Sequence, residues 1–162
     1  MANSIACDLV QSRIDYANSL YTGMSSANFN KLQMMQNTLA RVVTLTKKRD
    51  HIQPTLKRLH WLQIHQRVNY KVAMLTYTIR LSGEPHHLNA MLIYYRPTRT
   101  LRSADELLLV IPRTKLCSAD RAFSVAAPKL WNTLPADIRY SNTITIFRKL
   151  LKTYLYKQAF EH

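Results

Sequence analysis

The chain has 162 residues and a formal net charge of +14, because 23 lysine and arginine residues outnumber 9 aspartate and glutamate residues. It contains only two glycines, Gly23 and Gly83. Glycine-rich phosphate loops, dinucleotide-binding turns and the turn that exposes a nucleophilic serine need closely spaced glycines, so the sequence excludes them. Scarce glycine also disfavours an all-β domain, whose tight turns need positive φ. We therefore predict a mainly helical, basic protein.

Cysteines and hydropathy indicate the compartment. Cys7 and Cys117 are isolated, so they supply neither a disulfide framework nor a zinc ribbon. No apolar run is long enough to cross a bilayer, and the N-terminus lacks the pattern of a signal peptide. We expect an intracellular protein, cytoplasmic or nuclear, with no membrane partner. Its first residues resemble the middle of a helix, which leads us to expect a chain that begins inside a larger protein.

Apolar periodicity predicts helices along the first half of the chain. A first helix is expected near 4–20 and ends before Gly23. The clearest pattern predicts a second helix over 27–46, with Gln36 on the flank of its apolar stripe. That stripe consists of Phe29, Leu32, Met35, Leu39 and Val42.

Three more helices are predicted before residue 96. Asp50 is expected to cap a short one that has Pro54 in its first turn and faces Ile52, Leu56 and Leu59 inward. A long helix follows over 63–82, and Gly83 with Pro85 ends it. Its apolar face consists of Ile64, Val68, Val72, Leu75 and Ile79. Residues 86–95 are expected to form one more short helix.

The pattern changes after residue 95. The apolar run 107–111 predicts a strand, which pairs with 115–118 or 121–125 in a small β-hairpin near 107–125. Pro128 and Pro135 each open a helical turn, and a last helix begins at Thr143 or Thr145. The expected fold is mainly α, a helical bundle of about five to seven helices with this hairpin. We expect two parts, 1–95 and 96–162, packed as one unit.

The sequence offers no catalytic constellation. His60 and His65 are five residues apart and do not share a helix face, and neither cysteine has a neighbour at metal-ligand spacing. There is no Asp-Asp dipeptide of the kind found in two-metal polymerases, and the adjacent Asp105 and Glu106 diverge. Such acids are explained as solvated groups that balance nearby arginines. We predict no catalysis, cofactor, metal or small-molecule substrate.

The distribution of charge favours nucleic acid as a partner. Residues 31–60 contain seven basic residues and one acidic residue, and a basic excess attracts polyanions. Residues 96–102 alternate arginine with threonine after a pair of tyrosines, which suits RNA or single-stranded DNA. A solvated basic surface, with these tyrosines in the core, is the alternative. The predicted contact residues are Lys47, Lys48, Arg49, Lys57, Arg58, Tyr95, Arg96, Arg99, Arg102, Arg113, Lys115 and Arg121.

Six stretches in order carry a resemblance to a known family. They are SRIDYANSLYTG (12–23), KLQMMQNTLARVV (31–43), DHIQPTLKRLHWLQIHQRVNYKV (50–72), YRPTRTLRS (95–103), DRAFSVAAPKLWNTLPADIR (120–139) and FRKLLKTYLY (147–156). Together they resemble the C-terminal segment, after the thumb, of the reverse-transcriptase polyprotein of LINE-type non-LTR retrotransposons, in the jockey-like and chicken-repeat-like groups. The string DRAFSVAAPKLWNTLP is the most specific part of the resemblance.

The resemblance implies a tail that helps to hold the element's RNA or the target DNA during target-primed reverse transcription, alongside the polymerase domain of the parent protein. This sequence contains neither the polymerase aspartates nor the endonuclease, so their activities do not transfer to it. A structural module that docks on a polymerase thumb and an inert product of a decayed element are the alternatives. Core packing explains the apolar residues of DRAFSVAAPKLWNTLP, with direct nucleic-acid contact there as the alternative. Arg121 and Arg139 are expected at the surface.

Overall fold

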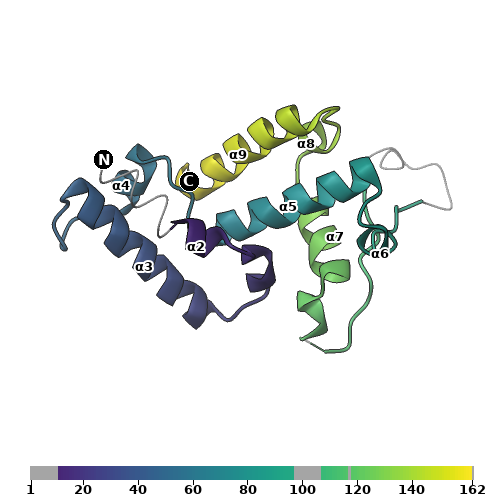
Figure 1. The fold of residues 1–162 in the computed structure, drawn as a ribbon, viewed down its shortest axis with the longest axis horizontal. Helices are drawn as coiled ribbons and strands as arrows, with labels where there is room; N and C mark the ends of the chain where they lie inside the picture. Colours follow the sequence, from purple (N-terminus) through teal and green to yellow (C-terminus); the bar gives the residue numbers. More distant parts are fainter. Residues whose placement is uncertain (1–10, 97–106, 117, 162) are drawn as a thin grey trace. The chain divides into compact units, whose positions relative to one another are not determined.

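The computed structural model describes residues 11–96, 107–116 and 118–161, and within them the protein is mainly helical, as predicted (Figure 1). None of the described helices is long and apolar enough to cross a membrane. The described residues form α2 (Ser12–Asp15), α3 (Ser26–Thr44), α4 (Gln53–Arg58), α5 (Ile64–Ser82), α6 (His86–Asn89), α7 (Phe123–Thr133), α8 (Ala136–Arg139) and α9 (Ile144–Phe160), with 3-10 turns η2 (Asn18–Tyr21) and η3 (Ala119–Arg121).

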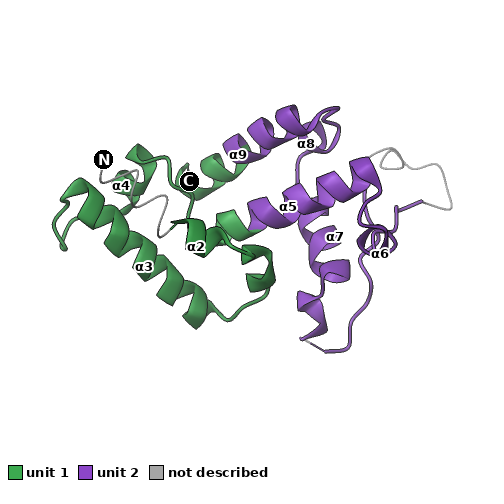
Figure 2. Cartoon of the chain, in the orientation of Figure 1, with its two compact units in different colours: residues 1–68, 154–162 green, residues 69–153 purple. Residues whose placement is uncertain are grey.

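The chain divides into two compact units (Figure 2). Unit 1 comprises residues 1–68 and 154–162, and unit 2 comprises residues 69–153. The long helices α5 and α9 each cross the boundary between the units, so α9 returns the end of the chain to unit 1. The sequence pattern led us to expect a division into 1–95 and 96–162. Apolar periodicity shows where a helix lies, but not that one helix belongs to two units.

The core of unit 1 forms where α3 meets α4. Ala40, Leu56 and Trp61 are buried there. Pro54 lies in the first turn of α4, as expected, and His60 ends the helix in the left-handed conformation at φ 54°. The backbone N–H of Trp61 then donates to the Leu56 carbonyl oxygen at 3.0 Å, which is the long bond of a Schellman cap. This cap turns the indole toward the core. The side chains packed around it are Leu39, Val43, Ile52, Leu59 and Phe160.

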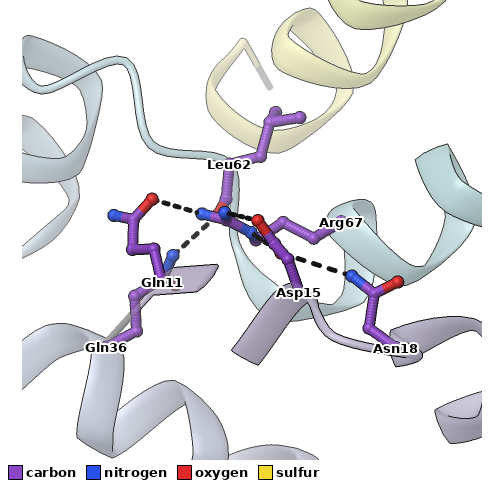
Figure 3. A network of polar contacts seen from close by, with 6 residues as sticks. All are labelled: Gln11, Asp15, Asn18, Gln36, Leu62 and Arg67. Carbon is purple, nitrogen blue, oxygen red and sulfur yellow. Dashed lines mark hydrogen bonds and ion pairs between the residues drawn. The ribbon is translucent and has the colours of Figure 1, made fainter. Parts of the chain in front are cut away.

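The buried face of α3 differs from the predicted stripe. Met35 and Val42 are 58% and 67% exposed, whereas Gln36 is fully buried. The Gln36 amide tolerates burial because it donates to the Leu62 carbonyl oxygen at 2.9 Å (Figure 3). It also accepts a hydrogen bond from Gln33 at 2.9 Å. The prediction placed Gln36 on the flank of the apolar stripe because its side chain is polar. The buried face of α3 is instead rotated about the helix axis relative to that stripe, so the hydrogen-bonded Gln36 amide faces inward.

An arginine holds the start of the described chain to α5 in unit 1. Arg67 forms an ion pair with Asp15, with its Nε donating to Oδ1 at 2.7 Å, and it also donates to the Gln11 side-chain oxygen at 2.9 Å. Asn18 donates to the same carboxylate at 3.3 Å (Figure 3). These polar bonds, together with the buried Ile14, hold α2 in unit 1.

The first predicted helix is wrong in its second half. It was expected near 4–20, of which residues 4–10 lie outside the described part of the chain. The observed α2 ends at Asp15, Ala17 is left-handed at φ 50°, and a 3-10 turn follows. Leu20, expected on the apolar face, is 82% exposed because this turn points it away from the core of unit 1.

The core of unit 2 is aromatic. Phe147 of α9 stacks on Tyr77 of α5 with ring centres 4.1 Å apart, and Trp131 of α7 lies 5.9 Å from the Phe147 centre. Phe147 and Trp131 are both fully buried. The Tyr77 hydroxyl donates to the Ser141 carbonyl oxygen at 2.8 Å, which satisfies its polar end. Thr143 caps α9 by accepting from the Ile146 N–H at 3.3 Å, as predicted.

The predicted β-hairpin near 107–125 is wrong. Leu109 instead forms an isolated antiparallel bridge with Tyr94, and its other backbone edge binds the Asn132 side chain through bonds of 3.0 Å and 2.8 Å. The Asn132 amide thus acts as the neighbour that a second strand would have supplied. Of the residues expected to form that strand, Arg121 ends η3 and 123–125 begin α7, whereas 115, 116 and 118 lie in no described helix or strand.

Candidate nucleic-acid interface

A cationic turn of unit 1 follows α3. The Arg41 guanidinium donates to the carbonyl oxygens of Lys47 and Asp50, the latter at 2.9 Å, and the Asp50 carboxylate accepts the Lys47 N–H at 3.3 Å. These bonds engage the backbone of the turn and leave its cationic side chains unused. Lys47, Lys48 and Arg49 are all exposed. Arg41 is thus a positioning residue that the sequence analysis did not identify.

A second pair of cations lies in the last turn of α4. Lys57 and Arg58 are both exposed. The Tyr156 hydroxyl, on the end of α9 in unit 1, donates to the Lys57 carbonyl oxygen at 2.9 Å, and its ring lies 5.8 Å from His60. The end of α4 is therefore held through its backbone and its cap, so the two cationic side chains extend from a fixed position.

We call Lys47, Lys48, Arg49, Lys57 and Arg58 the unit 1 basic surface. None of the five forms an ion pair with any other residue that the structure describes. Uncompensated cations on one compact unit create a positive potential that concentrates polyanions. All five predicted contact residues of this unit are therefore exposed and electrostatically available.

The remaining predicted contacts belong to unit 2. Tyr95 is 42% exposed, Arg96 is exposed, and the Tyr95 N–H donates to the Leu108 carbonyl oxygen at 2.9 Å. Because Tyr94 is also 43% exposed, neither ring is buried in the core, although the Arg80 guanidinium lies over the Tyr94 ring. Arg99 and Arg102 lie outside the described residues.

Arg80 is a functional candidate that sequence reasoning missed. It lies in the last turn of α5, where its guanidinium carbon is 4.3 Å from the centre of the Trp131 ring and 5.1 Å from that of Tyr94. Its Nε is buried without a hydrogen-bond partner, and no described carboxylate pairs with it. Nothing in sequence spacing predicts this cluster, because the fold alone brings Trp131 to Arg80.

The last three predicted contacts, Arg113, Lys115 and Arg121, are exposed on unit 2. Between them the Thr114 hydroxyl donates to Asp120, and Lys129 contacts the same carboxylate at 3.2 Å. These two bonds, followed by the charge of Lys129, lower the pKa of Asp120 below its usual range. The carboxylate therefore stays ionised and neutralises part of the local positive charge.

The surface prediction for Arg139 is wrong. Its exposed fraction is 6%, beside Ile138 at 5%. Both residues end the single-turn helix α8, which follows Pro135, and both are buried in unit 2. Arg139 therefore serves the fold and is excluded from the candidate interface.

Comparisons add no family to this picture. Models of known protein families, curated proteins and solved structures yield no significant match to the chain. Within the described residues, no three histidine, cysteine, aspartate or glutamate side chains gather where they could hold a metal ion. The candidate interface therefore depends on the exposure, charge and hydrogen bonding of its own residues.

Proposed function

We propose that this chain is a non-catalytic nucleic-acid-binding accessory domain of a LINE-type retrotransposon reverse transcriptase, acting inside the cell on the element's RNA or its DNA target. The observation that carries the proposal is the unit 1 basic surface, whose five exposed cations pair with no described carboxylate. Only the sequence resemblance supports the assignment to this family. The charge and geometry of unit 1 support nucleic-acid binding independently of that resemblance.

Fixed backbone geometry supports binding over a merely solvated surface. A solvated basic loop needs no fixed conformation, whereas Arg41 binds two carbonyl oxygens of the turn that carries Lys47, Lys48 and Arg49. Fixing that turn reduces the conformational entropy that a ligand must remove on binding. Phosphate groups along a strand are the ligands that such closely spaced cations attract most strongly.

The aromatic residues of unit 2 favour single strands over duplex. The half-exposed ring of Tyr95 offers a surface on which an unpaired base can stack, and Arg96 follows directly with its charge exposed. Bases inside a duplex are already stacked and cannot use such faces. We infer that single-stranded RNA or DNA is the preferred form.

The test is a salt titration of binding. Fluorescently labelled single-stranded RNA and DNA of about 20 nucleotides are bound to the full chain across a range of potassium chloride concentrations. Replacing Lys47, Lys48 and Arg49 together by glutamine is expected to weaken binding and to flatten the plot of log affinity against log salt by about two, because each phosphate contact on a single strand contributes about 0.7.

A matched control separates this surface from general charge. Lys149, Lys152 and Lys157 are also exposed, and replacing these three by glutamine removes the same charge from α9. We expect this control to retain most of the nucleic-acid affinity and of the salt slope. Equal losses of affinity in both triple variants would show that binding depends on net charge alone. No binding by the unaltered chain near physiological salt would favour a structural module or an inert product.

An enzymatic assay tests whether the chain is non-catalytic. The chain is incubated with primed RNA template, deoxynucleotides and magnesium, and separately with DNA substrate, and products are resolved on gels. We expect no extension and no cleavage. Turnover that disappears when one acidic residue is replaced by its amide would show that the chain is an enzyme.

A further inference from the structure

Helix α3 has a second apolar face in addition to the one packed in the core of unit 1. Met34, Met35 and Val42 are 67%, 58% and 67% exposed, although the sequence pattern predicted that Met35 and Val42 face the core. The buried face of the same helix contains Gln36 and Ala40. The apolar residues of α3 therefore exceed what the described part of unit 1 covers.

Two hollows follow this exposed face, with volumes of about 570 Å³ and 660 Å³. Both are lined only by α3 and the turn after it, and they share Met34, Thr38 and Val42. These three residues are spaced by four and form one ridge along the helix, with a groove on each side. Helices pack by placing such ridges into each other's grooves, so this relief fits another helix. Methionine thioethers adapt readily to such a partner.

The charges around the two hollows indicate which kind of helix would dock there. Lys31 borders the first hollow, Arg41 and Lys48 border the second, and α3 contains no acidic residue. A second copy of this chain would bring the same cations against one another, which disfavours self-association through this face. Nucleic acid is also disfavoured, because the ridge has no aromatic ring for a base to stack on.

We propose that the exposed face of α3 docks an acidic amphipathic helix from a protein partner. Its apolar residues, spaced three and four apart, would lie in the two grooves beside Met34, Thr38 and Val42. Its glutamate or aspartate residues would flank that stripe and face Lys31 on one side and Arg41 with Lys48 on the other. The apolar ridge takes no part in the proposed nucleic-acid function, although Lys48 borders both surfaces.

The probe is a designed helical peptide of about 18 residues, nearly the length of α3, with leucines on one stripe and glutamates beside it. A second peptide replaces every glutamate by lysine. Fluorescence anisotropy with the full chain is expected to show saturable binding of the glutamate peptide and at least about ten-fold weaker binding of the lysine peptide. Equal binding of both would overturn the charge argument.

Two variants test the location. Val42→Gln is expected to weaken the glutamate peptide about ten-fold, whereas Leu116→Gln, a control on an equally exposed leucine of unit 2 at 67%, leaves its affinity unchanged. Lys31→Glu is expected to weaken the glutamate peptide and strengthen the lysine peptide. Equal effects of Val42→Gln and Leu116→Gln, or unchanged affinity for both peptides in Lys31→Glu, would overturn the proposal.

Other occupants are separated by two further measurements. Sedimentation of the unaltered chain is expected to show a monomer, and dimerisation abolished by Val42→Gln would assign the face to a second copy instead. The double variant Lys47→Gln with Arg49→Gln, which keeps Lys48 in place, is expected to bind the glutamate peptide within about two-fold of the unaltered chain while losing part of its RNA affinity. Loss of RNA binding in Val42→Gln, with no peptide binding, would assign the face to nucleic acid.

Discussion

The Arg80 guanidinium carbon lies 4.3 Å from the centre of the fully buried Trp131 ring. Tyr94 covers the guanidinium from a further direction, with 5.1 Å between its ring centre and the same carbon. A planar guanidinium can stack on aromatic faces and keep its charge, which an ammonium group cannot do with the same geometry. Arg80 thus joins the aromatic core of unit 2 to its half-exposed tyrosine.

Replacing Arg80 should separate stacking from charge. Arg80→Gln is expected to lower the free energy of unfolding by about 1–2 kcal/mol, and Arg80→Lys should recover only part of this loss because it restores charge without the plane. Urea unfolding followed by Trp131 fluorescence in a Trp61→Phe background measures both variants. Full stability in Arg80→Lys would show that charge alone suffices, and stacking would then have no role.

The contrast between Gln36 and Met35 gives a second prediction. Gln36→Leu should lower the free energy of unfolding by about 1–3 kcal/mol, because the buried Leu62 carbonyl loses its donor and Gln33 loses an acceptor. Met35→Ala should change it by less than about 0.5 kcal/mol, because the side chain is exposed. The predicted stripe, with Met35 in the core, requires the opposite order, so thermal or urea unfolding of the two variants decides between them.

Long periodic helices were predictable from this sequence, and their orientation was less so. The helix expected over 63–82 is α5, and Ile64, Val68 and Val72 are buried as predicted. The helix over 27–46 was also correct in extent, but its buried face was not. Apolar patterning assumes that every apolar residue faces the core. That assumption fails where a helix has a second apolar face and where a buried amide such as Gln36 is hydrogen-bonded at both its nitrogen and its oxygen.

Non-local bonds explain the other errors and the missed residues. The run 107–111 has the composition of a strand, yet its pairing partners are Tyr94 and the Asn132 side chain, both distant in sequence. Cations of the unit 1 basic surface were predictable because a local charge run needs no tertiary information. Arg41 and Arg80 were not, since their roles depend on which backbone and rings the fold brings to them.

The end of α3 gives a third prediction. Leu45 is left-handed at φ 55° and 89% exposed, a conformation that costs an L-residue with a Cβ about 1–2 kcal/mol. Leu45→Gly should therefore raise the free energy of unfolding, by about 0.5–1 kcal/mol after the greater entropy of unfolded glycine is included. Thr44→Gly, one residue earlier inside the helix, should lower it by a similar amount. Urea unfolding that destabilises both variants equally would contradict this assignment.

The carboxylate of Asp120 gives a fourth prediction, concerning pH. The Thr114 hydroxyl, then the Lys129 ammonium, lower the pKa of Asp120 below its ordinary 3.8. The folded state therefore binds this proton more weakly than the unfolded state. The resulting stabilisation is present above pH 3.8 and is lost as the pH falls through the lower folded-state value.

Removing the first of these bonds should shift the titration. Thr114→Val is expected to raise the pKa of Asp120 toward its ordinary value, and carbon-detected NMR of the Asp120 carboxyl group follows it directly. Thr133→Val, where the hydroxyl binds only the Leu130 carbonyl oxygen, serves as the matched control and should leave the titration unchanged. An unaltered Asp120 curve in Thr114→Val would assign the lowered pKa to Lys129 alone. Lys129→Gln should then raise the pKa of Asp120 by itself, whereas we expect both variants to raise it because the two groups bind the same carboxylate oxygen.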